Sequence, residues 1–77
     1  MRATTWDTEW AAEKASAAMV YLADFYPECS GSPMLHPYQD AAHQAAVADD
    51  KSAYLEALRA YMRAGRDEAL RVRREAA

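Results

Sequence analysis

A proline-rich segment divides this chain and constrains its fold more than any other feature. Residues 27–37 read PECSGSPMLHP and contain three prolines and one glycine. Proline lacks the backbone N–H that a helix interior requires, so one helix ends before Pro27 and the next begins near Pro37. We expect a loop over 27–37, with Pro37 as the first helical residue after it and His36 held outside helical geometry.

The residues on both sides of this loop favour helices. Three valines and three threonines are the only β-branched residues, isoleucine is absent, and nineteen residues are alanine. The expected helices cover residues 6–26, 37–48 and 51–74. Thr4 or Thr5 would cap the first helix, and Asp49 and Asp50 would end the second and cap the third. The predicted fold class is all-α, a small three-helix bundle in a single domain over 1–77.

The third helix has the clearest apolar period. Its apolar and small residues recur at alternating steps of three and four, which defines one face of a helix. They are Leu55, Leu58, Met62, Gly65, Ala69 and Val72. Because nearly half of the apolar residues are alanine, the core is expected to be thin. Its larger anchors would be Leu22, Phe25, Leu55, Leu58 and Met62. Gly65 predicts either a close helix contact, which we favour, or a kink or break, since glycine costs about 1 kcal/mol relative to alanine.

Arginines lie beside this apolar face and form what we call the basic stripe. The stripe contains Arg59, Arg63, Arg66, Arg73 and Arg74. Residues 1–50 carry eight acids and two bases, a net charge of −6, whereas residues 51–77 carry four acids and seven bases, a net charge of +3. Arginines beside a core commonly meet acids of a neighbouring helix, and we expect that here. Within the helix, Asp67 should pair with Arg71 and Glu56 with Arg59. The alternatives are that the stripe contacts phosphates of a nucleic acid or binds an acidic protein partner.

The first predicted helix has two apolar stripes. One comprises Ala11, Ala15, Ala18, Met19, Leu22, Phe25 and Tyr26, and should pack on the other helices. The second comprises Trp6, Trp10, Ala17 and Tyr21. Either this helix is central and buries both stripes, or the second stripe is a partner-binding surface. In the latter case Trp6, Trp10 and Tyr21 form its aromatic centre, and Glu13 and Asp24 form an acidic rim.

Candidate chemistry is sparse. The residues that resemble a reactive or metal-binding set are Cys29, His36, Asp40 and His43. They lack the paired short spacings of a zinc site, and nothing in the sequence supplies an oxyanion site for a Cys–His nucleophile. Glycine-rich phosphate loops are also absent from the sequence. We therefore expect no enzyme, no metal and no cofactor.

These features predict a small non-catalytic helical module that binds and modulates a larger protein partner or self-associates as a homodimer. A second hypothesis is a phage or mobile-element inhibitor, similar in size and acidity to anti-CRISPR proteins, whose acids occupy a basic nucleic-acid channel. Those acids would be Asp7, Glu9, Glu13, Asp24, Glu28, Asp40, Asp49 and Asp50. A third is nucleic-acid binding through the basic stripe, which the net charge of −3 disfavours.

The sequence also bears on location. Residues 1–16 lack the apolar core of a signal peptide, and the longest apolar run, at 17–23, is far shorter than a membrane span. The single cysteine gives no internal disulfide. We expect a cytoplasmic protein that does not bind a membrane.

Overall fold

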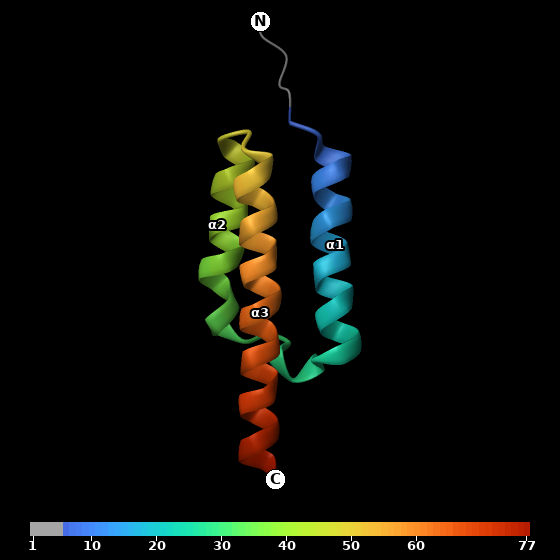
Figure 1. Ribbon diagram of the computed structural model, residues 1–77, viewed down its shortest axis with the longest axis vertical. Coiled ribbons are helices and arrows are strands. Elements are labelled where there is room, and N and C mark those ends of the chain that lie inside the picture. Colours follow the sequence, from blue (N-terminus) through green and yellow to red (C-terminus); the bar gives the residue numbers. More distant parts are fainter. Residues whose placement is uncertain (1–5) are drawn as a thin grey trace, which may run out of the picture.

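In the computed structural model, which describes residues 6–77, the chain forms three α-helices joined by short connections (Figure 1). The helices are α1 (Thr8–Phe25), α2 (His36–Val47) and α3 (Lys51–Ala76). Two 3-10 turns, η1 (Pro27–Cys29) and η2 (Pro33–Leu35), lie between α1 and α2. The prediction of an all-α three-helix bundle is confirmed.

Aspartates begin the two longer helices. The Asp7 carboxylate accepts a hydrogen bond from the Trp10 amide at 2.9 Å, and the Asp50 carboxylate accepts one from the Ala53 amide at 3.0 Å. Asp50 is the expected cap of α3. The expectation for α1 is wrong, because the cap is Asp7 and not the threonines at positions 4 and 5, which lie outside the described residues. Asp7 stands three residues before Trp10, the spacing that a carboxylate cap requires.

The connection between α1 and α2 is more regular than expected. Its two 3-10 turns each start with a proline, and η2 runs directly into α2. His36 was predicted to be non-helical, but it has φ −57° and ψ −44°, which is helical geometry. Its amide donates to the Pro33 carbonyl, so the preceding turn holds His36 in the helical region despite the proline that follows.

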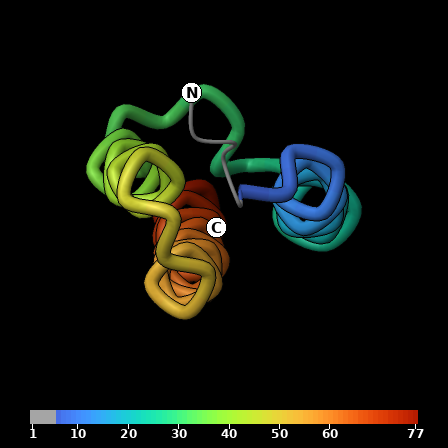
Figure 2. The backbone as a smooth tube through the Cα atoms, turned by 90° about the horizontal axis from the view of Figure 1, so that it is seen from above, coloured from blue at the N-terminus to red at the C-terminus, as the bar shows by residue number. Residues whose placement is uncertain are grey.

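The central helix is α3. Both α1 and α2 pack along it, while these two helices make few contacts with each other. Seen from above, α1 and α2 are set apart (Figure 2). The alternative in which the first helix is central is therefore wrong, because the alanine-rich face of α2 packs on α3 and leaves α1 on another flank.

The core consists of two clusters along α3. The upper cluster contains Ala11, Ala42, Ala45, Tyr54, Ala57 and Leu58, and the lower one contains Leu22, Cys29, Leu35 and Ala69. Of the predicted anchors, Leu22 and Leu58 are buried and Leu55 and Met62 are half-buried. Phe25 is wrongly predicted, since its side chain is 62% exposed and lies against Tyr21 at 5.5 Å between ring centroids.

Gly65 is a point of close helix contact. The helix α3 continues through it without a break, and Gly65 is buried against Leu22 of α1. A Cβ atom at position 65 would lie 2.6 Å from one Leu22 Cδ atom and 2.8 Å from the other. The absence of a side chain therefore permits α1 and α3 to approach, as the contact interpretation predicted.

Candidate partner-binding groove

An apolar groove runs between α1 and α2, with α3 as its floor, and we call it the α1–α2 groove. Its α1 wall contains Ala15, Met19, Val20 and Ala23, and its α2 wall contains His36, Gln39 and His43. Tyr54, Leu58 and Tyr61 of α3 form the floor. The groove exists because both outer helices pack on α3 and hardly on each other.

The lower end of the groove is shaped by the turns that follow α1. Tyr26, Pro27 and Leu35 border this end, and the hollow there measures about 470 Å³. This volume lies in the range of pockets that bind small molecules or side chains. The end is open along one side, so the groove can accept an extended or helical segment that runs parallel to α1.

Two large apolar side chains stand exposed on the α1 wall. Met19 is 59% exposed and Val20 is 53% exposed, and both line the groove. The sequence had assigned Met19 to the packing face of the first helix, and the structure instead turns it towards the groove. Exposed apolar side chains that lie together in a concave surface are typical of interaction sites.

Acidic side chains border the groove on the outside. Glu13 and Asp24 lie seven residues before and four residues after Val20, so helical geometry places all three on one edge of α1. Asp40 lies four residues after His36 and three before His43, so it shares an edge of α2 with these two groove residues. Glu13, Asp24 and Asp40 are exposed and form no ion pair within residues 6–77. The rim of the groove is therefore negatively charged.

The predicted aromatic surface is divided between two places. Trp6 and Trp10 pack on the upper core cluster, with their ring centroids 5.2 Å and 5.9 Å from that of Tyr54. Tyr21 lies lower on α1, half-buried against the lower cluster. None of Trp6, Trp10, Tyr21, Glu13 and Asp24 lines the α1–α2 groove, and helical geometry places Glu13 and Asp24 beside it, along the edge of α1 that carries Val20. Partner binding by these five residues stays a prediction.

The basic stripe is only partly neutralised inside the fold. Arg73 donates to both carboxylate oxygens of Glu28, at 2.7 and 2.9 Å, and to the Phe25 carbonyl at 2.7 Å. This hydrogen bonding lowers the pKa of Glu28 and raises that of Arg73. Arg66 approaches only its neighbour Asp67, at 3.5 Å. Arg59, Arg63 and Arg74 have no ion pair in the described part of the chain.

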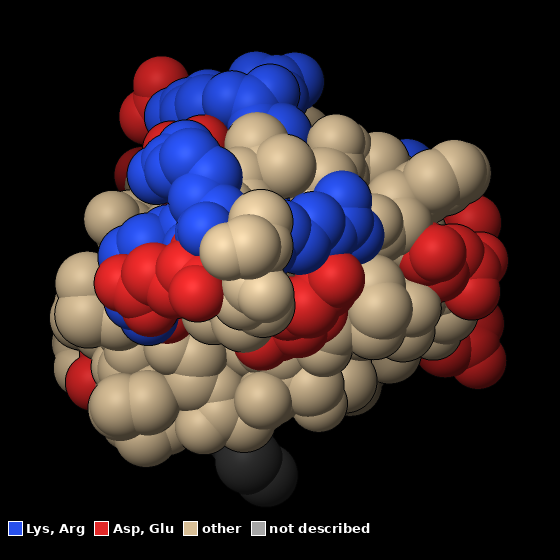
Figure 3. Space-filling view, turned by 90° about the horizontal axis from the view of Figure 1, so that it is seen from below, with Lys and Arg blue, Asp and Glu red and all other residues tan. Residues whose placement is uncertain are grey.

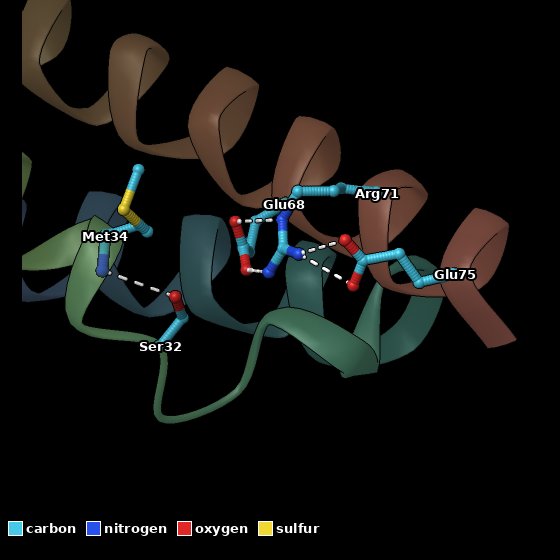
Figure 4. Close-up of polar contacts among 5 residues, drawn as sticks. All are labelled: Ser32, Met34, Glu68, Arg71 and Glu75. Atoms are coloured by element: carbon cyan, nitrogen blue, oxygen red, sulfur yellow. Dashed lines mark hydrogen bonds and ion pairs between the residues drawn. The ribbon is translucent and has the colours of Figure 1, made fainter.

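Arg71 lies outside the stripe and is fully engaged. Its guanidinium group sits between Glu68 and Glu75 and donates to both carboxylates (Figure 4). These bonds raise the pKa of Arg71 and lower that of Glu68. The expected Asp67–Arg71 pair does not form, because the Arg71 guanidinium group is already bonded to Glu68 and Glu75, one turn away on either side. Glu56 and Arg59 also form no pair among residues 6–77.

The candidate reactive residues do not converge. No three His, Cys, Asp or Glu side chains of the described chain lie close enough to share a metal ion. Cys29 is buried in the lower core cluster, and burial raises the pKa of its thiol. A buried, protonated thiol is a poor nucleophile, so the geometry gives Cys29 a packing role. His36 and His43 instead line the groove.

No helix within residues 6–77 is long and apolar enough to cross a bilayer. Comparison of the chain with known protein families, with curated proteins and with solved structures finds no match.

Sequence reasoning missed the groove, although one signal was present. Residues 17–23 read AAMVYLA and are apolar on every side of the helix. A helix that packs on one neighbour needs one apolar face, so apolar residues all round it indicate a second contact surface. That surface was assigned to Trp6, Trp10 and Tyr21, whereas the structure places Met19 and Val20 in the open groove.

Proposed function

We propose that this protein is a small non-catalytic interaction module whose α1–α2 groove binds an amphipathic helix of a larger protein. The observation that carries the proposal is the exposure of Met19 and Val20 along a groove with an apolar floor. Amphipathic helices bind such grooves by inserting apolar residues spaced at i, i+3, i+4 and i+7.

The arrangement of the three helices supports a helical occupant. Both α1 and α2 pack on α3 but not tightly on each other, which leaves one side of the bundle open. A fourth helix in this position would contact both outer helices and complete a four-helix arrangement. Its apolar side chains would cover Met19 and meet Tyr61 on the floor.

The charge of the rim indicates the chemistry of the occupant. Glu13 and Asp24 on α1 and Asp40 on α2 face solvent beside the apolar walls, and none has a basic partner within the described residues. Complementary charges across an interface give specificity and faster association. We therefore expect lysines or arginines along both edges of the bound helix.

The test uses two designed 18-residue helical peptides with the same leucine face. One carries lysines and the other glutamates beside that face, and binding of each is measured by isothermal titration calorimetry. The lysine peptide should bind and the glutamate peptide should bind much more weakly. Met19→Glu should weaken binding of the lysine peptide by about tenfold or more, which corresponds to about 1.4 kcal/mol.

Met34→Glu is the matched control. Met34 is 62% exposed, close to the 59% of Met19, but it does not line the groove. This variant introduces the same charge and should bind the lysine peptide as the wild-type protein does. Equal losses for both variants, or equal binding of the two peptides, would contradict the proposal. If light scattering showed a stable homodimer that Met19→Glu dissociates, the occupant of the groove would be a second copy of the chain and not another protein.

A further inference from the structure

A second hollow lies on the other side of α1, where this helix meets α3. It is bordered by Arg59, Arg63 and Arg66 of the basic stripe, with Tyr21 and Met62 beside them. The three arginines are spaced by four and three residues and therefore project from one face of α3. This hollow is separate from the α1–α2 groove, and none of these five residues lines that groove.

The arginines here have little to neutralise them. Arg59 and Arg63 are exposed and form no ion pair with any residue of 6–77, and Arg66 meets only the exposed carboxylate of its neighbour Asp67. By contrast, Arg71 and Arg73 on the same helix are held by carboxylates. Seen from below, Lys and Arg side chains gather over one side of the molecule, with Asp and Glu side chains among some of them (Figure 3).

The hollow has apolar surface between its charged groups. Met62 and the ring of Tyr21 are half-buried between the arginines. On the α2 side, Arg59 and Arg63 also border a shallow surface lined by Ala57 and Ala60, with one carboxylate, that of Glu56, at its edge. A ligand across this face of α3 would therefore meet cationic groups with apolar surface on either side of them.

From these contacts we infer that the Arg59–Arg63–Arg66 face binds an acidic protein segment with an apolar anchor side chain. Carboxylates of the segment accept hydrogen bonds from the arginines, whose planar guanidinium groups suit bidentate contacts with carboxylates. The anchor side chain fills the space over Met62 and Tyr21. The hollow beside Met62 and Tyr21 favours a protein segment with such an anchor over a polynucleotide, which would meet the arginines through its phosphates alone.

The probe is a fluorescein-labelled twelve-residue peptide of glutamate and serine with one central phenylalanine. Its binding is followed by fluorescence anisotropy at low salt. Arg63→Ala should weaken binding about tenfold, the ratio that one charge-assisted hydrogen bond supplies. Replacement of the phenylalanine by serine in the peptide should also weaken binding, because the anchor is lost.

Arg74→Ala is the matched control, since Arg74 is exposed on α3 without an ion pair in the described residues and does not border the hollow. It removes the same charge and should change binding less than twofold. If Arg63→Ala and Arg74→Ala weakened peptide binding equally, binding would depend only on the total charge of the protein, and the inference would be overturned. Absence of binding, or binding of a dT12 oligonucleotide and not of the peptide, would also overturn it. Failure here leaves the groove proposal unaffected, because that proposal rests on different residues and a basic probe.

Discussion

The Tyr54 side chain joins α3 to the start of α1. Its hydroxyl group donates a buried hydrogen bond to the Ala11 carbonyl at 3.0 Å, and its ring contacts Trp6 and Trp10. Burial raises the pKa of the Tyr54 hydroxyl, which keeps it protonated as a donor. Tyr54 thus fixes the position of α1 at the upper end of the groove.

Tyr54→Phe is expected to destabilise the protein by about 0.5–1.5 kcal/mol, because it removes this buried hydrogen bond and keeps the ring contacts. Thermal unfolding followed by circular dichroism would show a fall in Tm of about 4–8 °C for each kcal/mol lost. Tyr38→Phe is the control, since Tyr38 is half-buried and its hydroxyl group forms no hydrogen bond within residues 6–77. Equal Tm values for the Tyr54 variant and wild type would show that the hydrogen bond does not contribute.

Gly65 sets the distance between α1 and α3. Gly65→Ala improves helix propensity by about 1 kcal/mol, but the new Cβ atom would overlap the Leu22 side chain. Leu22 is 3% exposed and belongs to the lower core cluster, so its Cδ atoms would have to shift, and overpacking typically costs about 1–3 kcal/mol. We expect a net loss of about 1 kcal/mol in the free energy of unfolding, measured by urea denaturation.

The same substitution in a Leu22→Val background separates the two effects. Valine lacks the Cδ atoms that the new Cβ atom would meet, so Gly65→Ala should be neutral or stabilising there. Equal losses in both backgrounds would show that the glycine is required for a reason other than contact with Leu22.

At the scale of the elements, one ion pair ties η1 to the lower end of α3. Glu28 of η1 accepts two hydrogen bonds from Arg73, and the Arg73 guanidinium lies 5.3 Å from the centre of the Tyr26 ring. Arg73 also holds the end of α1 through the Phe25 carbonyl. This single arginine therefore connects the last turn of α1, the first 3-10 turn and α3.

This pair makes stability depend on pH. Because the pKa of Glu28 is lowered in the folded protein, the unfolded chain binds a proton more readily as pH falls. The stabilisation is present above about pH 4.3, the ordinary pKa of glutamate, and is lost as pH falls through the lower folded value. Glu28→Gln should therefore show a smaller loss of stability on acidification, measured as urea midpoints between about pH 6 and pH 3.

Glu13→Gln is the control for this pH series, because Glu13 is exposed and has no ion pair in the described structure. It should retain the acid-induced loss of the wild-type protein. The Glu68–Arg71 pair remains in both variants, so neither curve becomes flat. Identical curves for Glu28→Gln and wild type would contradict the assigned role of the pair.

Local signals predicted the elements well. Pro27 ends α1 within one residue of the expected position, and Asp50 begins α3 as its side chain dictates. The period of α3 identified Leu58, Ala69 and the contact at Gly65. The α1 cap was wrongly predicted because several nearby residues, two threonines and Asp7, can each cap a helix. His36 was wrongly predicted because the preceding 3-10 turn holds it in helical geometry, although a residue before proline usually avoids that geometry.

At the scale of the whole molecule, prediction was weaker because packing order depends on contacts distant in sequence. Nothing local specifies that α3 and not α1 is central, since this follows from the packing of α2 on α3 and not on α1. Once α3 is central, Met19 faces an open groove. The sequence suggested Glu13 and Asp24 as the rim of a surface formed by Trp6, Trp10 and Tyr21, and it did not indicate the α1–α2 groove.

The fold also separates the charges of the chain by surface. Three of the eight acids in residues 1–50 serve the fold, since Asp7 and Asp50 cap helices and Glu28 pairs with Arg73. Other acids border the groove, while free arginines occupy a different face of α3. The proposed module therefore presents two surfaces of opposite charge, and occupation of a nucleic-acid channel by the acids stays a prediction.

The groove is the central claim, and mapping a bound peptide tests it most directly. Amide chemical shifts of the ¹⁵N-labelled protein would be followed by NMR while the 18-residue lysine peptide is added. We predict the largest changes at the groove residues Ala15, Met19, Val20, Gln39 and His43. Changes centred instead on Tyr21, Arg59 and Arg63, or on Trp6 and Trp10, with the groove residues unaffected, would contradict the account.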